Sequence, residues 1–124
     1  MSGPLIFAYT RKQAIEDGVL VDVTETAREA GFVIPVAVTC GVWAECVRVP
    51  DGVTGQDEAG RLWDVLMMLR FAVRKASEGN RVDFAVHVRS DDNGGTPPLV
   101  SLYAVCGPGD ESEPVVTVML PHED

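Results

Sequence analysis

The stretch Gln56–Ser77, QDEAGRLWDVLMMLRFAVRKAS, decides how the rest of the chain must be arranged. From Leu62 to Ala76 its apolar residues recur at spacings of four, three, four and three, which is the period of an α-helix. Before it, Thr54 and Asp57 have the spacing of a capping box. Further apolar residues widen the helical stripe: Trp63, Val65, Met67, Met68, Phe71 and Ala72. We expect so apolar a helix to be buried on most of its surface, by its own sheet or by a second subunit.

The residues after this central helix predict three strands. Val82–Arg89 alternates apolar and polar residues, a pattern typical of a strand with one buried face. Leu99–Cys106 and Val115–Leu120 are the next two strands, and turn residues at Asp91–Gly95 and Gly107–Pro114 separate the three. Consecutive strands joined by short loops favour antiparallel neighbours. The prediction is therefore a long central helix packed on a C-terminal three-stranded antiparallel meander.

The N-terminal part predicts shorter elements. Three stretches begin with a threonine that can cap a helix: Thr10–Asp17, Thr24–Ala30 and Thr39–Val47. Val19–Val23 is a short strand rich in β-branched residues. The apolar segment Phe32–Val38 contains Pro35, which limits it to a sheet edge or a bend. With 124 residues, the expected fold is a single α+β domain, 1–124, in which N-terminal helices and a short strand precede the central helix and the meander.

The charge of the chain is strongly negative and unevenly distributed. It has 19 acidic residues against 10 Lys and Arg, a net charge of −9. Residues 61–89 are net basic, whereas residues 90–124 contain no Lys or Arg. Direct nucleic-acid binding is disfavoured, because that affinity depends on basic residues displacing counterions. The most unusual feature is a set of acidic residues on a loop and at the C-terminus: Asp110, Glu111, Glu113, Glu123 and Asp124. They form either a solvated face or a surface that imitates nucleic-acid phosphates and binds a basic protein.

The sequence also favours a cytoplasmic protein that does not enter membranes. Met1–Phe7 lacks the basic start and the long apolar run of a signal peptide. The longest apolar run, Val65–Leu69, is far shorter than the ~20 residues that a membrane-spanning helix needs. The three cysteines include no C-x-x-C pair, which fits a reducing compartment.

Neither a metal site nor a catalytic cysteine is predicted. Cys40, Cys46, His87 and His122 are suitable ligand types but lack the close pairs that zinc sites use. Cys106 and His87 lie on predicted strands and would be a nucleophile and its base. The loop after Cys106 is acidic, however, and a buried cysteine at a strand end is the favoured alternative. We expect no cofactor.

Three further segments have simple explanations. Asp91–Gly94 has the first residues of a calcium loop, but position twelve is Leu102 instead of glutamate, so a turn is expected. Gly107–Asp110 lacks the lysine of a phosphate-binding loop. The last turns of the central helix carry a basic cluster made of Arg70, Arg74 and Lys75. The cluster either stabilises the C-terminal end of the helix dipole or binds an anion or an acidic partner.

Several segments together resemble a known group of proteins. They are Tyr9–Arg11, Asp17–Val23, Ala27–Phe32, Pro35–Thr39, Gly60–Leu66, Cys106–Asp110 and Met119–Asp124. The chain resembles a family of uncharacterised bacterial and phage proteins, a domain of unknown function often carried on plasmids and other mobile elements. The resemblance covers nearly the whole chain and implies no established activity and no catalytic residues. It makes a role in mobile-element biology more plausible, as an association without a mechanism.

Three functions remain open from the sequence. The leading hypothesis is a non-enzymatic, acidic protein-binding module of mobile-element origin, with nucleic-acid mimicry or an anti-defence role as versions of it. A small enzyme is the second, with a site between helices and sheet drawn from four residues: Asp22, Asp64, His87 and Tyr103. The third is a self-associating module, because an apolar central helix left exposed would be a site for a second copy.

Overall fold

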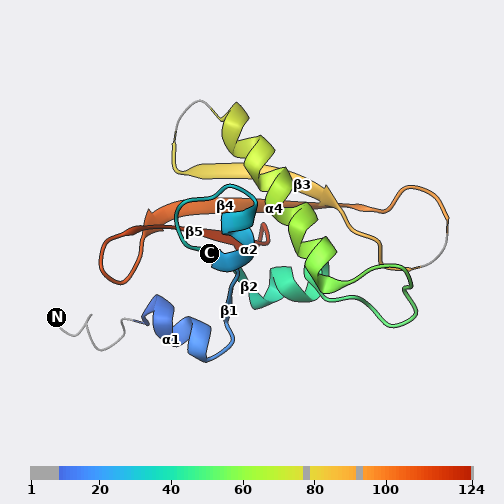
Figure 1. Cartoon of the computed structure of the whole chain (residues 1–124), viewed down its shortest axis with the longest axis horizontal. Helices are drawn as coiled ribbons and strands as arrows, with labels where there is room; N and C mark the ends of the chain where they lie inside the picture. The colour runs from blue at the N-terminus through green and yellow to red at the C-terminus, as the bar shows by residue number, and fades with distance from the viewer. Residues whose placement is uncertain (1–8, 77–78, 92–93, 124) are drawn as a thin grey trace.

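A five-stranded mixed sheet forms the centre of the molecule, with the strand order β1-β2-β5-β4-β3 (Figure 1). The structure is a computed structural model and describes residues 9–76, 79–91 and 94–123. The strands are β1 (Leu20–Asp22), β2 (Val36–Thr39), β3 (Arg81–His87), β4 (Leu99–Pro108) and β5 (Pro114–Met119). β3, β4 and β5 are antiparallel neighbours, β2 lies parallel to β5, and β1 is antiparallel to β2.

The chain is α+β, but the prediction of a three-stranded antiparallel meander as its sheet is wrong. The segment 36–39 is the second strand of a larger sheet and pairs in parallel with β5, with Val36 opposite Val116. Every residue of β2 is buried, which is typical of a strand covered on both faces. Pro35 does not hold this segment at an edge, because it lies just before the strand and its carbonyl accepts a hydrogen bond from the Val116 N–H.

In the described part of the chain, the helical elements beside the sheet are α1 (Arg11–Glu16), α2 (Thr24–Glu29), α3 (Cys40–Val42), the π-helical turn η2 (Trp43–Val47) and α4 (Glu58–Lys75). Thr10 caps α1 in a reciprocal capping box with Gln13, and Thr39 caps α3, as the sequence predicts. The prediction at Thr24 is wrong, because Thr24 is the first residue of α2. The carboxylate of Asp22 accepts hydrogen bonds from the N–H and the hydroxyl of Thr24 instead.

The central helix α4 crosses one face of the sheet (Figure 1). Its N-cap is Asp57, whose carboxylate accepts the Gly60 N–H at 2.7 Å, so the cap lies three residues later than Thr54. The inner side of α4 is buried against β3, η2 and α2 through Leu62, Val65, Leu66 and Leu69. Four large apolar side chains remain exposed by 39 to 51%: Trp63, Met68, Phe71 and Val73. Within one chain, the expectation that α4 is buried on most of its surface is therefore wrong.

The two faces of the sheet are covered differently. Val116 and Val118 of β5 belong to the same core cluster as Leu66 and Leu69 of α4. Thr117, between them, points to the opposite face, because side chains alternate along a strand. There the guanidinium of Arg11 donates hydrogen bonds to the Thr117 hydroxyl at 2.6 Å and to a β5 carbonyl at 2.9 Å. α1 thus lies across the sheet from α4.

Candidate functional site

A groove of about 630 Å³ lies between the outer side of α4 and the edge strand β3. α4 lines it with Met68, Phe71 and Lys75, β3 with its residues 81–85, and β4 with Leu99. Met68, Phe71 and Leu99 are 41%, 51% and 61% exposed. Large apolar side chains that gather on a surface are typical of protein-binding sites.

The backbone of β3 is open along one side of this groove, because β3 is the last strand in the sheet order. The Asn80 carbonyl accepts the Cys106 N–H at 2.8 Å, and the Val88 N–H donates to the Pro98 carbonyl at 2.9 Å. In an antiparallel pair, hydrogen-bonded residues alternate along the strand, so the even-numbered residues of β3 bond to β4. The odd-numbered residues 81, 83, 85 and 87 therefore direct their N–H and C=O groups to the open edge. Such an edge is a template for a further strand.

Basic groups surround the apolar part of the groove. Lys75 lines the groove itself, and Arg70 and Arg74 line a small hollow on the other side of Phe71. Arg70 also donates to the Ala30 carbonyl at the end of α2, at 3.0 Å. Arg81 pairs with Asp83 at 3.1 Å and stacks on the Tyr103 ring at 4.0 Å. This side of the molecule is locally basic although the whole chain is acidic.

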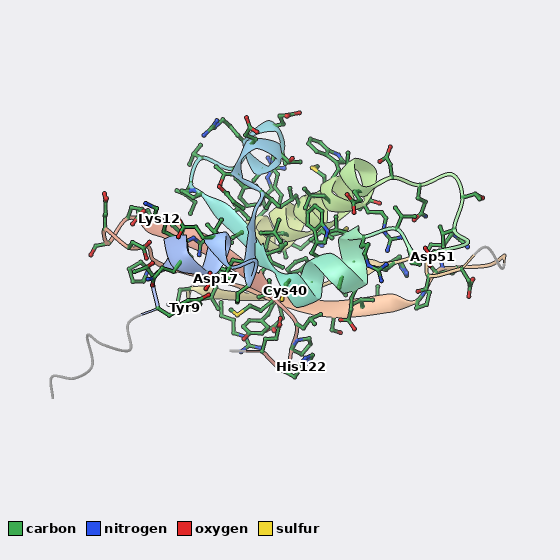
Figure 2. All side chains as sticks on the ribbon, turned by 90° about the horizontal axis from the view of Figure 1, so that it is seen from below. Tyr9, Lys12, Asp17, Cys40, Asp51 and His122 are labelled. Atoms are coloured by element: carbon green, nitrogen blue, oxygen red, sulfur yellow. The ribbon has the colours of Figure 1, made fainter. Side chains whose placement is uncertain are left out.

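The predicted acidic residues have different surroundings. Asp110 accepts the backbone N–H groups of Lys12 at 3.0 Å and Arg11 at 2.7 Å, which lowers the pKa of Asp110. Within the same loop, a carboxylate oxygen of Glu113 accepts the Glu111 N–H at 2.9 Å. Figure 2 shows Lys12 at the end of the molecule formed by α1 and the β4–β5 loop, with Asp51 at the opposite end. The two hydrogen bonds of Asp110 join α1 to the β4–β5 loop.

The C-terminal acids lie elsewhere. The carboxylate of Glu123 accepts hydrogen bonds from the Leu120 N–H and the Thr39 hydroxyl, both at 2.8 Å, and its carbonyl accepts the Tyr103 hydroxyl. Asp124 lies outside the described residues. Glu123 thus holds the end of β5 against the start of α3.

An acidic cluster that combines distant segments surrounds Arg11. Burial lowers the pKa of Arg11, and the carboxylates of Asp22, Asp110 and Glu113 act against this shift. Asp22 belongs to β1, whereas Asp110 and Glu113 belong to the β4–β5 loop. Folding therefore brings an acid of the N-terminal half and two of the predicted acidic residues within electrostatic range of the same arginine.

The four residues suggested for an enzyme do not meet at one site. The Asp22 carboxylate accepts hydrogen bonds from Thr24 at the start of α2, and the Tyr103 hydroxyl is bound to the C-terminal segment. Asp64 and His87 line a common cavity together with Arg61, but its volume is about 30 Å³. A cavity of that size holds about one or two water molecules and no substrate. Among residues 9–76, 79–91 and 94–123, no three His, Cys, Asp or Glu side chains gather as metal ligands would.

The structure does not bring Cys106 and His87 together. His87 is opposite Leu99, at the far end of the β3–β4 pair from Cys106, which places the two about 23 Å apart along the strands. The favoured alternative of a buried Cys106 is also wrong, because Cys106 is exposed, like Cys40. Cys46 is buried, and burial raises its pKa to about 11, which keeps the thiol protonated and unreactive.

The family model of a group of unknown function matches residues 2–124. The chain belongs to the family of unknown function DUF6573. No curated protein and no solved structure matches the chain. The resemblance to a domain of unknown function along nearly the whole sequence is thereby confirmed. Membership of DUF6573 does not by itself assign an activity to the site. In the part of the chain that the structure describes, no helix has both the length and the hydrophobicity to cross a bilayer.

Sequence reasoning missed two features of this DUF6573 chain. One is the groove. Its signal in the sequence was that α4 has more apolar residues than a helix needs when only one of its sides is buried. The other is Arg61, which is only 6% exposed although it carries a charge. Its guanidinium donates to the carbonyls of Val47 and Arg89 and to the Gln56 side chain. A charged residue beside the apolar stripe was the available signal.

Proposed function

We propose that the chain is a non-enzymatic protein-binding module that accepts an extended segment of a partner along β3. One observation carries this proposal: Met68 and Phe71 border the open edge of β3 in a single groove. An added strand would gain main-chain hydrogen bonds from the edge and apolar contacts from α4. In this mode of recognition the main chain supplies affinity, and the side-chain contacts supply specificity.

The alternation of β3 decides how an added strand would lie. Its backbone would bond to residues 81, 83 and 85, whose polar groups point to the open edge. Its side chains would alternate between the two faces of the sheet. One set would lie beneath α4, against Phe71 and Met68, and the other beside the Arg81–Asp83 pair.

A capture experiment with matched variants tests this function. Phe71→Ser removes an apolar side chain from the groove, whereas Val33→Ser removes one that is 96% exposed and does not line the groove. We expect a host protein to be retained by the wild-type chain and by Val33→Ser and lost by Phe71→Ser. In the complex, the amides of residues 81, 83 and 85 should become protected from hydrogen exchange. A partner that Phe71→Ser retains, with unprotected β3 amides, would contradict the proposal.

A second candidate surface has its own support. The net charge of −9 and the gathering of Asp22, Asp110 and Glu113 around Arg11 favour docking on a basic protein, including one that normally binds nucleic acid. Glu111→Lys reverses a charge there without removing the Asp110 contacts to α1. We expect complexes with nucleic-acid-binding host proteins to weaken with salt and with Glu111→Lys. Complexes that neither change affects would remove this candidate.

We further propose that the module is of bacterial or phage origin, is carried by mobile elements and works in the cytoplasm, where an anti-defence role would be one use of it. The resemblance described above supports the origin. The three cysteines, all free thiols, support a reducing compartment. Cell fractionation of a native host tests the compartment, and recovery of the chain outside the cytoplasm would contradict it.

A further inference from the structure

The charges around the groove favour one kind of occupant. Lys75 lines the groove, Arg74 and Arg70 flank Phe71 on its other side, and Arg81 is the first residue of β3. Asp83 is the acidic residue of β3, and it is already paired with Arg81. On the α4 side of the groove the basic residue is Lys75, whereas the Arg81 side chain lies on the opposite face of the sheet, stacked on Tyr103. An anionic side chain of the occupant beneath the end of α4 would meet the Lys75 ammonium.

The direction of the added strand determines where this anionic group lies in the partner. Antiparallel pairing is slightly more stable per residue than parallel pairing. In an antiparallel segment, the C-terminal end lies beside the start of β3, near Lys75 and Arg81. Side chains that share a face recur every second residue. A residue opposite Phe84 would therefore lie beneath Met68 and Phe71, and the residue two positions later would lie opposite Val82, near Lys75.

We infer that the groove binds an extended segment in which an apolar residue is followed, two positions later, by Asp or Glu. This inference rests on the proposed function and adds the chemistry of the partner to it. The apolar side chain would cover Met68 and Phe71, which are about half exposed. The carboxylate would lie beside the Lys75 ammonium. A partner with a basic residue at the same position would meet like charge there.

Three synthetic peptides test the inference against the intact chain. They are acetyl-TVTVTET-amide, acetyl-TVTVTQT-amide and acetyl-TVTVTKT-amide, which differ only in the residue two positions after the second valine. Titrations followed through backbone amide NMR signals give the affinity and show whether residues 81, 83 and 85 respond. We expect the glutamate peptide to bind about twofold to fivefold more tightly than the glutamine peptide, the range of one exposed ion pair. The lysine peptide should bind most weakly.

Two variants separate the groove charge from the charge of the whole chain. Lys75→Gln removes the groove lysine at the exposed end of α4 and should abolish the preference for glutamate. Lys12→Gln removes a lysine of α1, across the sheet, and should leave the preference unchanged. Equal affinities for the three peptides, with the β3 amides responding, would overturn the inference and leave the strand-docking function standing. If no peptide affects the β3 amides, the inference and the proposed function both fail.

Discussion

Replacing Arg61 with methionine should destabilise the fold by about 2–4 kcal/mol, although the substitution removes a buried charge. Arg61 is 6% exposed, and none of the described carboxylates lies within ion-pair distance of it. Its Nε donates to the Val47 carbonyl at 3.1 Å, and its Nη1 donates to the Gln56 side chain at 2.6 Å and the Arg89 carbonyl at 2.8 Å. One guanidinium thus joins η2, the loop before α4 and the segment after β3.

Two opposing effects set the magnitude. Methionine leaves the carbonyls of Val47 and Arg89 without this donor, and an unsatisfied buried polar group costs about 1–3 kcal/mol. Losing the Gln56 contact adds to this cost. Against it stands the desolvation of the cation, which is several kcal/mol, and the Nη2 of Arg61, which is buried without a hydrogen-bond partner among the described residues. The bonds to carbonyls outweigh the desolvation because they hold together three separate segments.

Urea unfolding followed by tryptophan fluorescence measures the effect. Arg70→Met is a matched control, because Arg70 lies on the same helix, is partly exposed and donates to a single carbonyl, and it should cost about 1 kcal/mol or less. Arg61→Lys should also destabilise, because lysine keeps the charge but lacks the planar fork. An Arg61→Met chain as stable as the wild type, or more stable, would refute the reasoning and show that desolvation dominates.

Three other predictions concern pH, thiol chemistry and backbone conformation. The pKa of Asp110 is lowered on folding, so its stabilising contribution is present above about pH 4, the unfolded pKa, and is lost as pH falls through the folded pKa. Asp110→Asn should therefore lower the urea midpoint at pH 7, and by progressively less as the pH is lowered below about 4. Cys46, with its pKa of about 11, should react with a thiol reagent at pH 8 far more slowly than the two exposed cysteines, and equal rates would contradict its burial. Gly31→Ala should cost about 1–3 kcal/mol in unfolding experiments and more than Gly18→Ala, because both glycines have positive φ but only at Gly31 does a Cβ meet the Arg70 guanidinium, at 2.9 Å.

The elements that could be predicted from the sequence are those with local causes. The caps at Thr10 and Thr39 depend on residues three positions apart, and the period of α4 is visible within its own segment. Such signals are present in the chain before any tertiary contact forms. Thr24 has the residue type of an N-cap, but whether a threonine precedes a helix or begins it depends on where β1 ends, which the sequence does not show.

The parallel pairing of β2 with β5 has no local cause. It joins residues 36–38 to residues 116–118, and an apolar segment such as VAV fits an edge, a bend or a buried strand equally well. The proline before it suggested an edge. In the structure its missing N–H costs nothing, because Pro35 contributes only its carbonyl to the pairing with β5. The observed sheet therefore has five strands instead of the predicted three, because the pairing of β2 depends on tertiary contacts that the sequence does not show.

The groove was equally inaccessible to sequence reasoning. Met68 and Leu69 are adjacent apolar residues of one helix, yet Leu69 is fully buried and Met68 is 41% exposed. Only the position of the sheet decides between them. For the acidic loop, the sequence predicted charge and exposure, but not that Asp110 would bind α1, a contact between residues 99 positions apart. The sequence pattern gives the residue types at these positions, but it does not show which residues they contact in the fold.

The strand order separates one acid of the second surface from the groove. Asp22 belongs to β1 and the groove to β3, and these strands form opposite edges of the five-stranded sheet. Four strand spacings correspond to about 19 Å. Because the Debye length is about 8 Å at physiological ionic strength, the carboxylate of Asp22 is largely screened from a segment that binds beside Lys75. At low salt that screening is lost, and the net charge of −9 would repel the acidic segment that the groove favours. The glutamate preference therefore belongs to Lys75 and its neighbours, while the overall charge acts against it.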